Sequence, residues 1–295
     1  CLTAYGTDME LRLDMKTMPL EAIEKQFGHT DAMTLPGNKF TAVVFLYAQS
    51  EPITVIFQKA LHELAHIYTK NKMKALGFDI TQYNDPQWAK KHQEKAEQDD
   101  AVCAAIGSCM WLEFIAEYIA FDTMNCILRS DNIPDVRSDM IRHSIQENIM
   151  SLMNTPLDYV FHPQEALRTV SYAFAAVAGL FFSAEGAYDV LVDEYTIDWE
   201  IGRPKRRKPV YNFGFSKRTA AGKELYRTII NLLETLYSQF VSKEDAYEKY
   251  NNDENLFYAD PVYHSEQYVL DYDTAVDIGM CIYNICGPLD ELADS

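Results

Sequence analysis

The sequence predicts a helix-rich protein of the α+β class. Apolar residues recur at helical spacing over most of the second half of the chain. Residues 40–47 form a nearly continuous run of apolar, β-branched and aromatic side chains, which is typical of a buried strand. The stretches around residues 62 and 113 carry histidine and glutamate among apolar neighbours at helical spacing. The prediction is therefore a small sheet with two helices that carry polar groups, followed by a mostly helical C-terminal half.

Taken in order, the elements follow from local patterns. Residues 19–27 have the spacing of a short helix, and a loop follows. After the strand at 40–47, a helix is expected at about 54–73, and Gly77 closes it because glycine adopts the left-handed conformation that ends helices. Residues 84–100 are polar and charged, as in a solvated helix or loop. Later helices are expected at 108–121, 134–153, 163–183, 216–241, 242–250 and 274–286.

Size and charge limit the classes of function. With 295 residues, of which 48% are hydrophobic, the chain can bury a large core in one or two domains. We expect residues 1–130 and 131–295 to form two regions with a soft boundary, one continuous domain being the alternative. The net charge of −18 disfavours binding to nucleic acid or to an anionic membrane. The basic cluster at 203–208 is interpreted as a solvated loop, with a phosphate or partner contact as the alternative.

The six cysteines indicate the compartment. They contain no Cys-x-x-Cys pair, and most lie in apolar helical contexts, which favours buried free thiols in a reducing cytoplasm. A chain that opens on Cys1 is also typical of a mature lipoprotein, but no flexible tether follows it. The expected location is therefore the cytoplasm. The longest uncharged stretch, 169–184, is short of a membrane span and suits a buried helix.

The segment His62-Glu63-Leu64-Ala65-His66 is a His-Glu-x-x-His motif. On a helix, residues four apart share a face, so His62 and His66 can both direct imidazole nitrogens at one ion. Zn²⁺ accepts imidazole and carboxylate ligands, and an open fourth position holds a water whose pKa falls to about 7. Glu63 is the expected general base, which takes a proton from that water.

A second helix is expected to supply the third ligand. Glu113, Ala116, Glu117 and Ala120 lie at three- and four-residue steps and form one stripe within an apolar helix. Small residues beside carboxylates predict the close approach of another helix, with one carboxylate reaching across. The stripe does not rank Glu113 against Glu117, because both lie on it one turn apart.

The two motifs together resemble the gluzincin group of zinc metallopeptidases. Glu113-x-x-Ala116-x-x-x-Ala120 is similar to the pattern of ImmA/IrrE-type peptidases, and Glu113-x-x-Ala116-Glu117 is similar to ArdC-type metallopeptidase domains. The resemblance implies a zincin-like region at 1–130, His62, His66 and Glu113 as zinc ligands, Glu63 as catalytic base, and Glu117 as a residue that supports a ligand. Ala65 departs from the glycine common in ImmA/IrrE-type helices, and no helix-turn-helix is found.

The predicted function is zinc-dependent hydrolysis of peptide bonds in a protein or peptide, by Glu63-assisted attack of zinc-bound water. The alternative is a metal-stabilised regulatory or protein-binding module without catalysis. A hydrolase also needs a group that stabilises the oxyanion. The sequence offers His143, His162, Tyr263 and His264, although ordinary packed or surface roles are favoured for each.

Overall fold

The structure is a computed structural model, and it describes several separate stretches of the chain. These are residues 32–35, 43–46, 53–85, 87, 98–128, 134–154, 163–183, 197–198, 203–204, 211–241 and 266–293. The expected helices at 19–27 and 242–250 lie outside them. The main helices are α3 (Ile53–Ala75), α5 (Gln98–Leu128), α6 (Pro134–Asn154), α7 (Pro163–Ser183), α9 (Ala220–Leu236) and α11 (Tyr272–Ala293).

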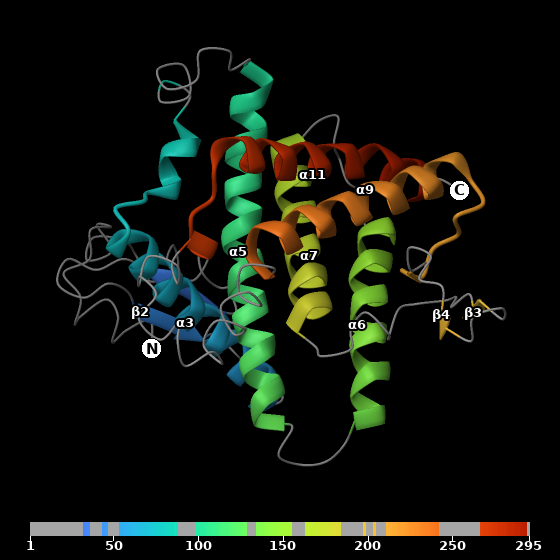
Figure 1. Ribbon diagram of the computed structural model, residues 1–295, viewed down its shortest axis with the longest axis horizontal. Helices are drawn as coiled ribbons and strands as arrows, with labels where there is room; N and C mark the ends of the chain where they lie inside the picture. Colours follow the sequence, from blue (N-terminus) through green and yellow to red (C-terminus); the bar gives the residue numbers. More distant parts are fainter. Residues whose placement is uncertain are drawn as a thin grey trace, which may run out of the picture.

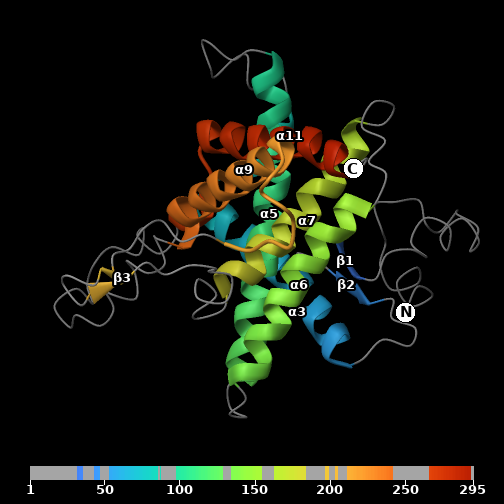
Figure 2. The ribbon, with the colours of Figure 1, turned by 90° about the vertical axis from the view of Figure 1, so that its right-hand side faces the viewer.

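The predicted α+β class is wrong, because the described part of the protein is mostly helical. Its strands form two isolated antiparallel pairs, β1 (Ala32–Leu35) with β2 (Val43–Leu46), and β3 (Ile197–Asp198) with β4 (Arg203–Pro204). A pair of such short strands cannot enclose a core, so it does not make the expected sheet layer. The β1–β2 pair lies beside α3 (Figure 2), while the large apolar surfaces are buried helix against helix.

The helices form two groups whose axes cross. α5, α6 and α7 stand side by side, and α9 and α11 lie across them in Figure 1. α5 is central, because α3, α7 and α11 all pack against it. One buried cluster draws residues from both sides of position 130, from Met73 of α3 to Leu289 of α11.

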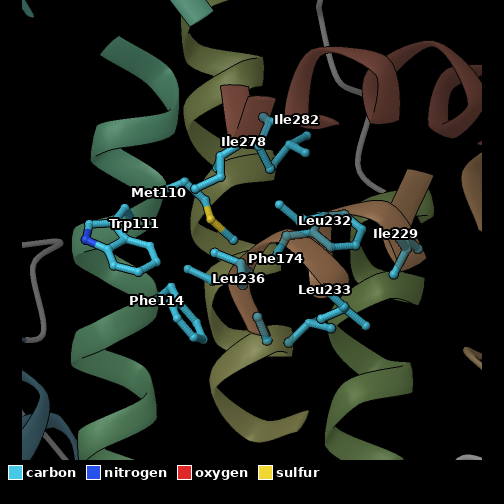
Figure 3. Close-up of a cluster of buried hydrophobic side chains, with 14 of the residues drawn as sticks. Met110, Trp111, Phe114, Phe174, Ile229, Leu232, Leu233, Leu236, Ile278 and Ile282 are labelled. Carbon is cyan, nitrogen blue, oxygen red and sulfur yellow. The ribbon is translucent and has the colours of Figure 1, made fainter. Parts of the chain in front are cut away.

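The core is built on the apolar side of α5. Met110, Trp111 and Phe114 are fully buried there. Figure 3 shows them facing side chains from three other helices, which are Phe174 of α7, Leu232 and Leu236 of α9, and Ile278 and Ile282 of α11. Burying a side chain of this size contributes about 1.5–3 kcal/mol, so this face holds α5 firmly in place. Because this apolar side is fixed in the core, the polar stripe of α5 that carries Glu113 and Glu117 is held toward α3.

Glycines set how closely α5 approaches its neighbours. A side chain at Gly107 would overlap the backbone of α11 at Ala275, and one at Gly279 would overlap the backbone of α5 at Cys103. At Gly179 of α7, an added Cβ would stand 2.5 Å from the Cβ of Glu117. The small residues therefore fix the contact of α5 with α11 above the polar stripe and with α7 beside it.

Helix α3 ends as the sequence predicts. Gly77 has φ of 70°, and the N–H of Phe78 donates to the carbonyl of Met73 at 2.9 Å. The N–H of Gly77 donates to the carbonyl of Lys74 at 3.1 Å. These two bonds form a Schellman motif, which satisfies the last carbonyls of the helix and turns the chain back toward α5.

Two of the core helices have the composition of membrane spans. Asp100–Met124 and Ala166–Ser183 are long and apolar enough to cross a membrane by length and composition alone. In their most apolar windows, 50% and 72% of the residues are buried inside the protein. The helices that carry these windows, α5 and α7, pack against each other and against α11 in the helical core.

Candidate metal centre

Helix α3 presents both histidines of the motif to α5. His62 and His66 lie one turn apart on the face that also buries Ala65 and Thr69. Their side chains are 16% and 11% exposed. Imidazoles at this depth need polar partners, because water no longer reaches most of the ring.

Helix α5 supplies those partners. The Oε2 atom of Glu113 lies 3.3 Å from Nε2 of His62 and 3.5 Å from Nε2 of His66. The two Nε2 atoms are 3.0 Å apart, and the rings meet edge to face with centroids 4.6 Å apart. Three atoms from two helices therefore converge on one point, although more than forty positions separate them in sequence.

The triangle has the dimensions of a tetrahedral zinc site. Zinc binds imidazole nitrogen and carboxylate oxygen at about 2.0–2.2 Å, which puts neighbouring ligands of an ideal tetrahedron about 3.3–3.6 Å apart. The three edges found here, 3.0, 3.3 and 3.5 Å, are close to that value. The donor set of two imidazoles and one carboxylate is also one that zinc accepts, so the residues fit the ion.

Electrostatics point to the same conclusion. Three electron-rich atoms at this spacing repel one another unless a proton or a cation lies between them. Burial lowers the pKa of His62, but the hydrogen bonds and charges of Glu113 and Glu117 outweigh burial and raise this pKa to about 10. Burial raises the pKa of Glu113, yet its interactions with His62 and His66 bring that pKa down to about 2. The cluster thus holds a positive charge strongly.

Glu117 has a different position from Glu113. Its Oε1 atom lies 3.3 Å from Nδ1 of His62, on the side of the ring that faces away from the triangle. This contact is an ion pair, and the other carboxylate oxygen, Oε2, is buried without a hydrogen-bond partner among the described residues. A carboxylate behind a ligand imidazole is the usual arrangement for orienting that ring.

Glu63 lies next to His62 in the protein interior. Only 7% of the residue is exposed, although its neighbour Leu64 is half exposed on the other side of α3. Glu63 is thus a buried carboxylate one residue from His62 on the same helix. Its role as catalytic base stays a prediction.

The residues considered for the oxyanion do not gather here. His143 is largely exposed on α6, where Nε2 lies 2.9 Å from Oε1 of Glu147. His162, Tyr263 and His264 lie outside the described residues.

Sequence reasoning missed two residues of α7, Arg168 and Tyr172, which interact with Glu113. Burial and the charge of Glu113 raise the pKa of Tyr172. The hydrogen bond to Tyr172 and, more weakly, the charge of Glu113 raise the pKa of Arg168. No motif marks these residues, and the i,i+4 spacing of Arg and Tyr on one helix was the one signal available.

Comparison with models of protein families, with curated proteins and with solved structures gave no match.

Proposed function

We propose that this protein is a zinc-dependent hydrolase of peptide bonds, acting on a protein or peptide. The observation that carries the proposal is the triangle of His62 Nε2, His66 Nε2 and Glu113 Oε2, with edges of 3.0–3.5 Å. Within the described residues this group offers three ligand atoms. Structural zinc sites normally close with four protein ligands, whereas catalytic sites use three and keep one position open.

Each residue of the site has a distinct task in this proposal. His62, His66 and Glu113 would hold the ion, and Glu117 would keep the His62 ring in its orientation from behind. When bound, zinc supplies Lewis acidity that polarises a carbonyl and acidifies water. Glu63 accepts the proton of the attacking water and then donates a proton to the leaving amine, so the peptide C–N bond breaks and a C–O bond forms.

The burial of Glu63 supports the enzyme over a metal-stabilised binding module. Glu63 is buried and is not a member of the ligand triangle. A purely structural site does not need a further carboxylate next to a ligand, because its ion is already held by other residues. Catalysis gives the carboxylate a use, since a base must lie beside the reacting water.

The decisive experiment combines zinc analysis with peptide cleavage. Purified protein should bind about one equivalent of zinc, and His62→Ala or His66→Ala should lose most of it. The zinc-loaded protein should generate new termini in a peptide library. Glu63→Gln should keep the zinc and lower turnover by about 10²-fold or more, because an amide cannot accept the proton.

Glu224→Gln is the matched control, since Glu224 is exposed on α9. Its zinc content and turnover should equal those of the wild type. Zinc-loaded wild-type protein that cleaves nothing would favour the binding module, and unchanged turnover in zinc-loaded Glu63→Gln would remove Glu63 from the mechanism.

A further inference from the structure

Arg168 and Tyr172 form a donor pair on α7. The Nε and Nη2 atoms of Arg168 donate to the hydroxyl oxygen of Tyr172 at 3.3 and 3.1 Å. The guanidinium carbon also lies 5.3 Å from the centre of the tyrosine ring. The two residues are four apart, so the helix itself holds them on one face. Their geometry is thus set locally, without help from other segments.

The register between α5 and α7 brings Tyr172, the C-terminal member of this pair, close to the level of the metal centre. The two helices run in the same direction (Figure 1), and Gly179 lies against Glu117. From this contact, Glu113 lies four residues back along α5 and Tyr172 seven residues back along α7. At a rise of about 1.5 Å per residue, Tyr172 and Glu113 differ by only about 5 Å along the helix axes.

The N–H and O–H groups of this pair that remain free to donate all require a hydrogen-bond acceptor. A guanidinium carries five N–H groups, and two of its nitrogens here each direct one of them at Tyr172. The Tyr172 oxygen accepts both bonds, which leaves its own O–H to donate. In the described part of the chain, no acceptor takes up that proton or the remaining guanidinium N–H groups. Both side chains are exposed, so a ligand can reach them.

A carboxylate satisfies this arrangement. It accepts several hydrogen bonds in one plane, and its charge is opposite to that of the guanidinium. A neutral amide would accept only through one oxygen and would place its own N–H groups against donors.

We propose that Arg168 and Tyr172 bind a carboxylate of the substrate beside the metal centre, and so direct the protein to peptides that carry one. This inference rests on the proposed function, because it names the substrate class of the same site. The carboxylate can come from the C-terminus of a peptide or from an aspartate or glutamate side chain, and both present the same chemistry.

The test measures binding instead of turnover, with zinc-loaded Glu63→Gln protein. The probes are N-acetyl-tetraalanine with a free C-terminus, the same peptide as its C-terminal amide, and the amide with one alanine replaced by aspartate. The free acid or the aspartate peptide should bind about ten-fold tighter than the plain amide, because a hydrogen bond between charged groups is stronger than one to a neutral amide. Tighter binding of the free acid would identify the C-terminus as the source of the carboxylate, and tighter binding of the aspartate peptide would identify an acidic side chain.

The same titrations on Arg168 variants test the assignment. Arg168→Gln should abolish the preference, Arg168→Lys should keep part of it, and Tyr172→Phe should reduce it a few-fold. Arg227→Gln, a matched change at an exposed arginine of α9, should leave it unchanged.

Equal affinity for all three probes, or no binding of the carboxylate probes, would overturn the inference. So would an unchanged preference in Arg168→Gln, which would leave the pair as a surface contact of α7. If the wild type cleaves peptides but shows no preference for a carboxylate, only this subsite is refuted. If the zinc-loaded wild type cleaves no peptide although it binds the carboxylate probes more tightly, only the proposed hydrolase function is refuted.

Discussion

At the scale of single residues, the two glutamates of α5 are separated by which nitrogen of His62 each one meets. Glu113 approaches Nε2, and Glu117 approaches Nδ1. An imidazole can bind a metal through one nitrogen while the other interacts with a supporting group. The two carboxylates therefore act from opposite sides of one ring, which sequence spacing does not reveal.

Zinc affinity should rank the two glutamates. Glu113→Ala removes a corner of the triangle, so affinity should collapse, whereas Glu117→Ala should weaken binding by about 10- to 100-fold. Competition titration with a chelator of known affinity measures both variants. If Glu117→Ala empties the site while Glu113→Ala stays loaded, the ligand assignment is one turn out of register.

The pH dependence of the metal-free protein follows from the two shifted pKa values. His62 has a folded pKa of about 10 against an ordinary 6.5, so its stabilisation is complete below pH 6.5 and is lost as the pH rises toward 10. Glu113 has a folded pKa of about 2 against 4.5, so its contribution is present above pH 4.5 and is lost on acidification toward 2. Urea denaturation of metal-free protein should therefore show the largest contribution of this cluster to the free energy of unfolding between pH 4.5 and pH 6.5. His62→Ala should flatten the alkaline side, and an unchanged profile would contradict the interaction.

At the scale of elements, the end of α3 depends on one backbone conformation. No atom lies within 4 Å of the position that a Cβ at Gly77 would take, so the cost of a side chain there is conformational alone. Gly77→Ala should lower the free energy of unfolding by about 1–2 kcal/mol, measured by denaturant titration. Gly77→Asn should cost less, because asparagine enters the left-handed region more readily. If both substitutions lower the free energy of unfolding equally, the cause is not the positive φ of residue 77.

The elements that the sequence predicted best are those whose signals are local. Helix α3, its glycine end and the pairing of His62 with His66 all depend on residues within a few turns. The run at 40–47 does contain a strand, β2 at Val43–Leu46, but the small sheet was mispredicted. A strand-like run does not reveal how many partners it will pair with, and in the described part of the chain β2 pairs with β1 alone. Arg168 and Tyr172 were missed because the register of α5 against α7 depends on a contact between Glu117 and Gly179, far apart in the chain.

At the scale of the whole molecule, a bound ion would link α3 to the helix around which the others pack. A ligand that binds only the folded state stabilises it by about 2.7 kcal/mol when its free concentration is 100 times the dissociation constant. Removing zinc with a chelator should therefore lower the melting temperature by several degrees, measured by calorimetry. Zinc should not change the melting temperature of His66→Ala, and an equal shift in both proteins would show that the ion acts elsewhere.

Helix α5 meets α11 at Gly107 and contacts His62 of α3 through Glu113, and these two contacts lie on one rigid helix. Each residue of an α-helix turns the chain by about 100°, so the six steps between them define an angle as well as a distance. One residue inserted in this interval would rotate the carboxylates away from both histidines while the glycine crossing stayed in place. The number of residues in the segment 108–112 therefore sets the direction in which Glu113 points, in addition to the packing that its buried side chains Met110 and Trp111 provide.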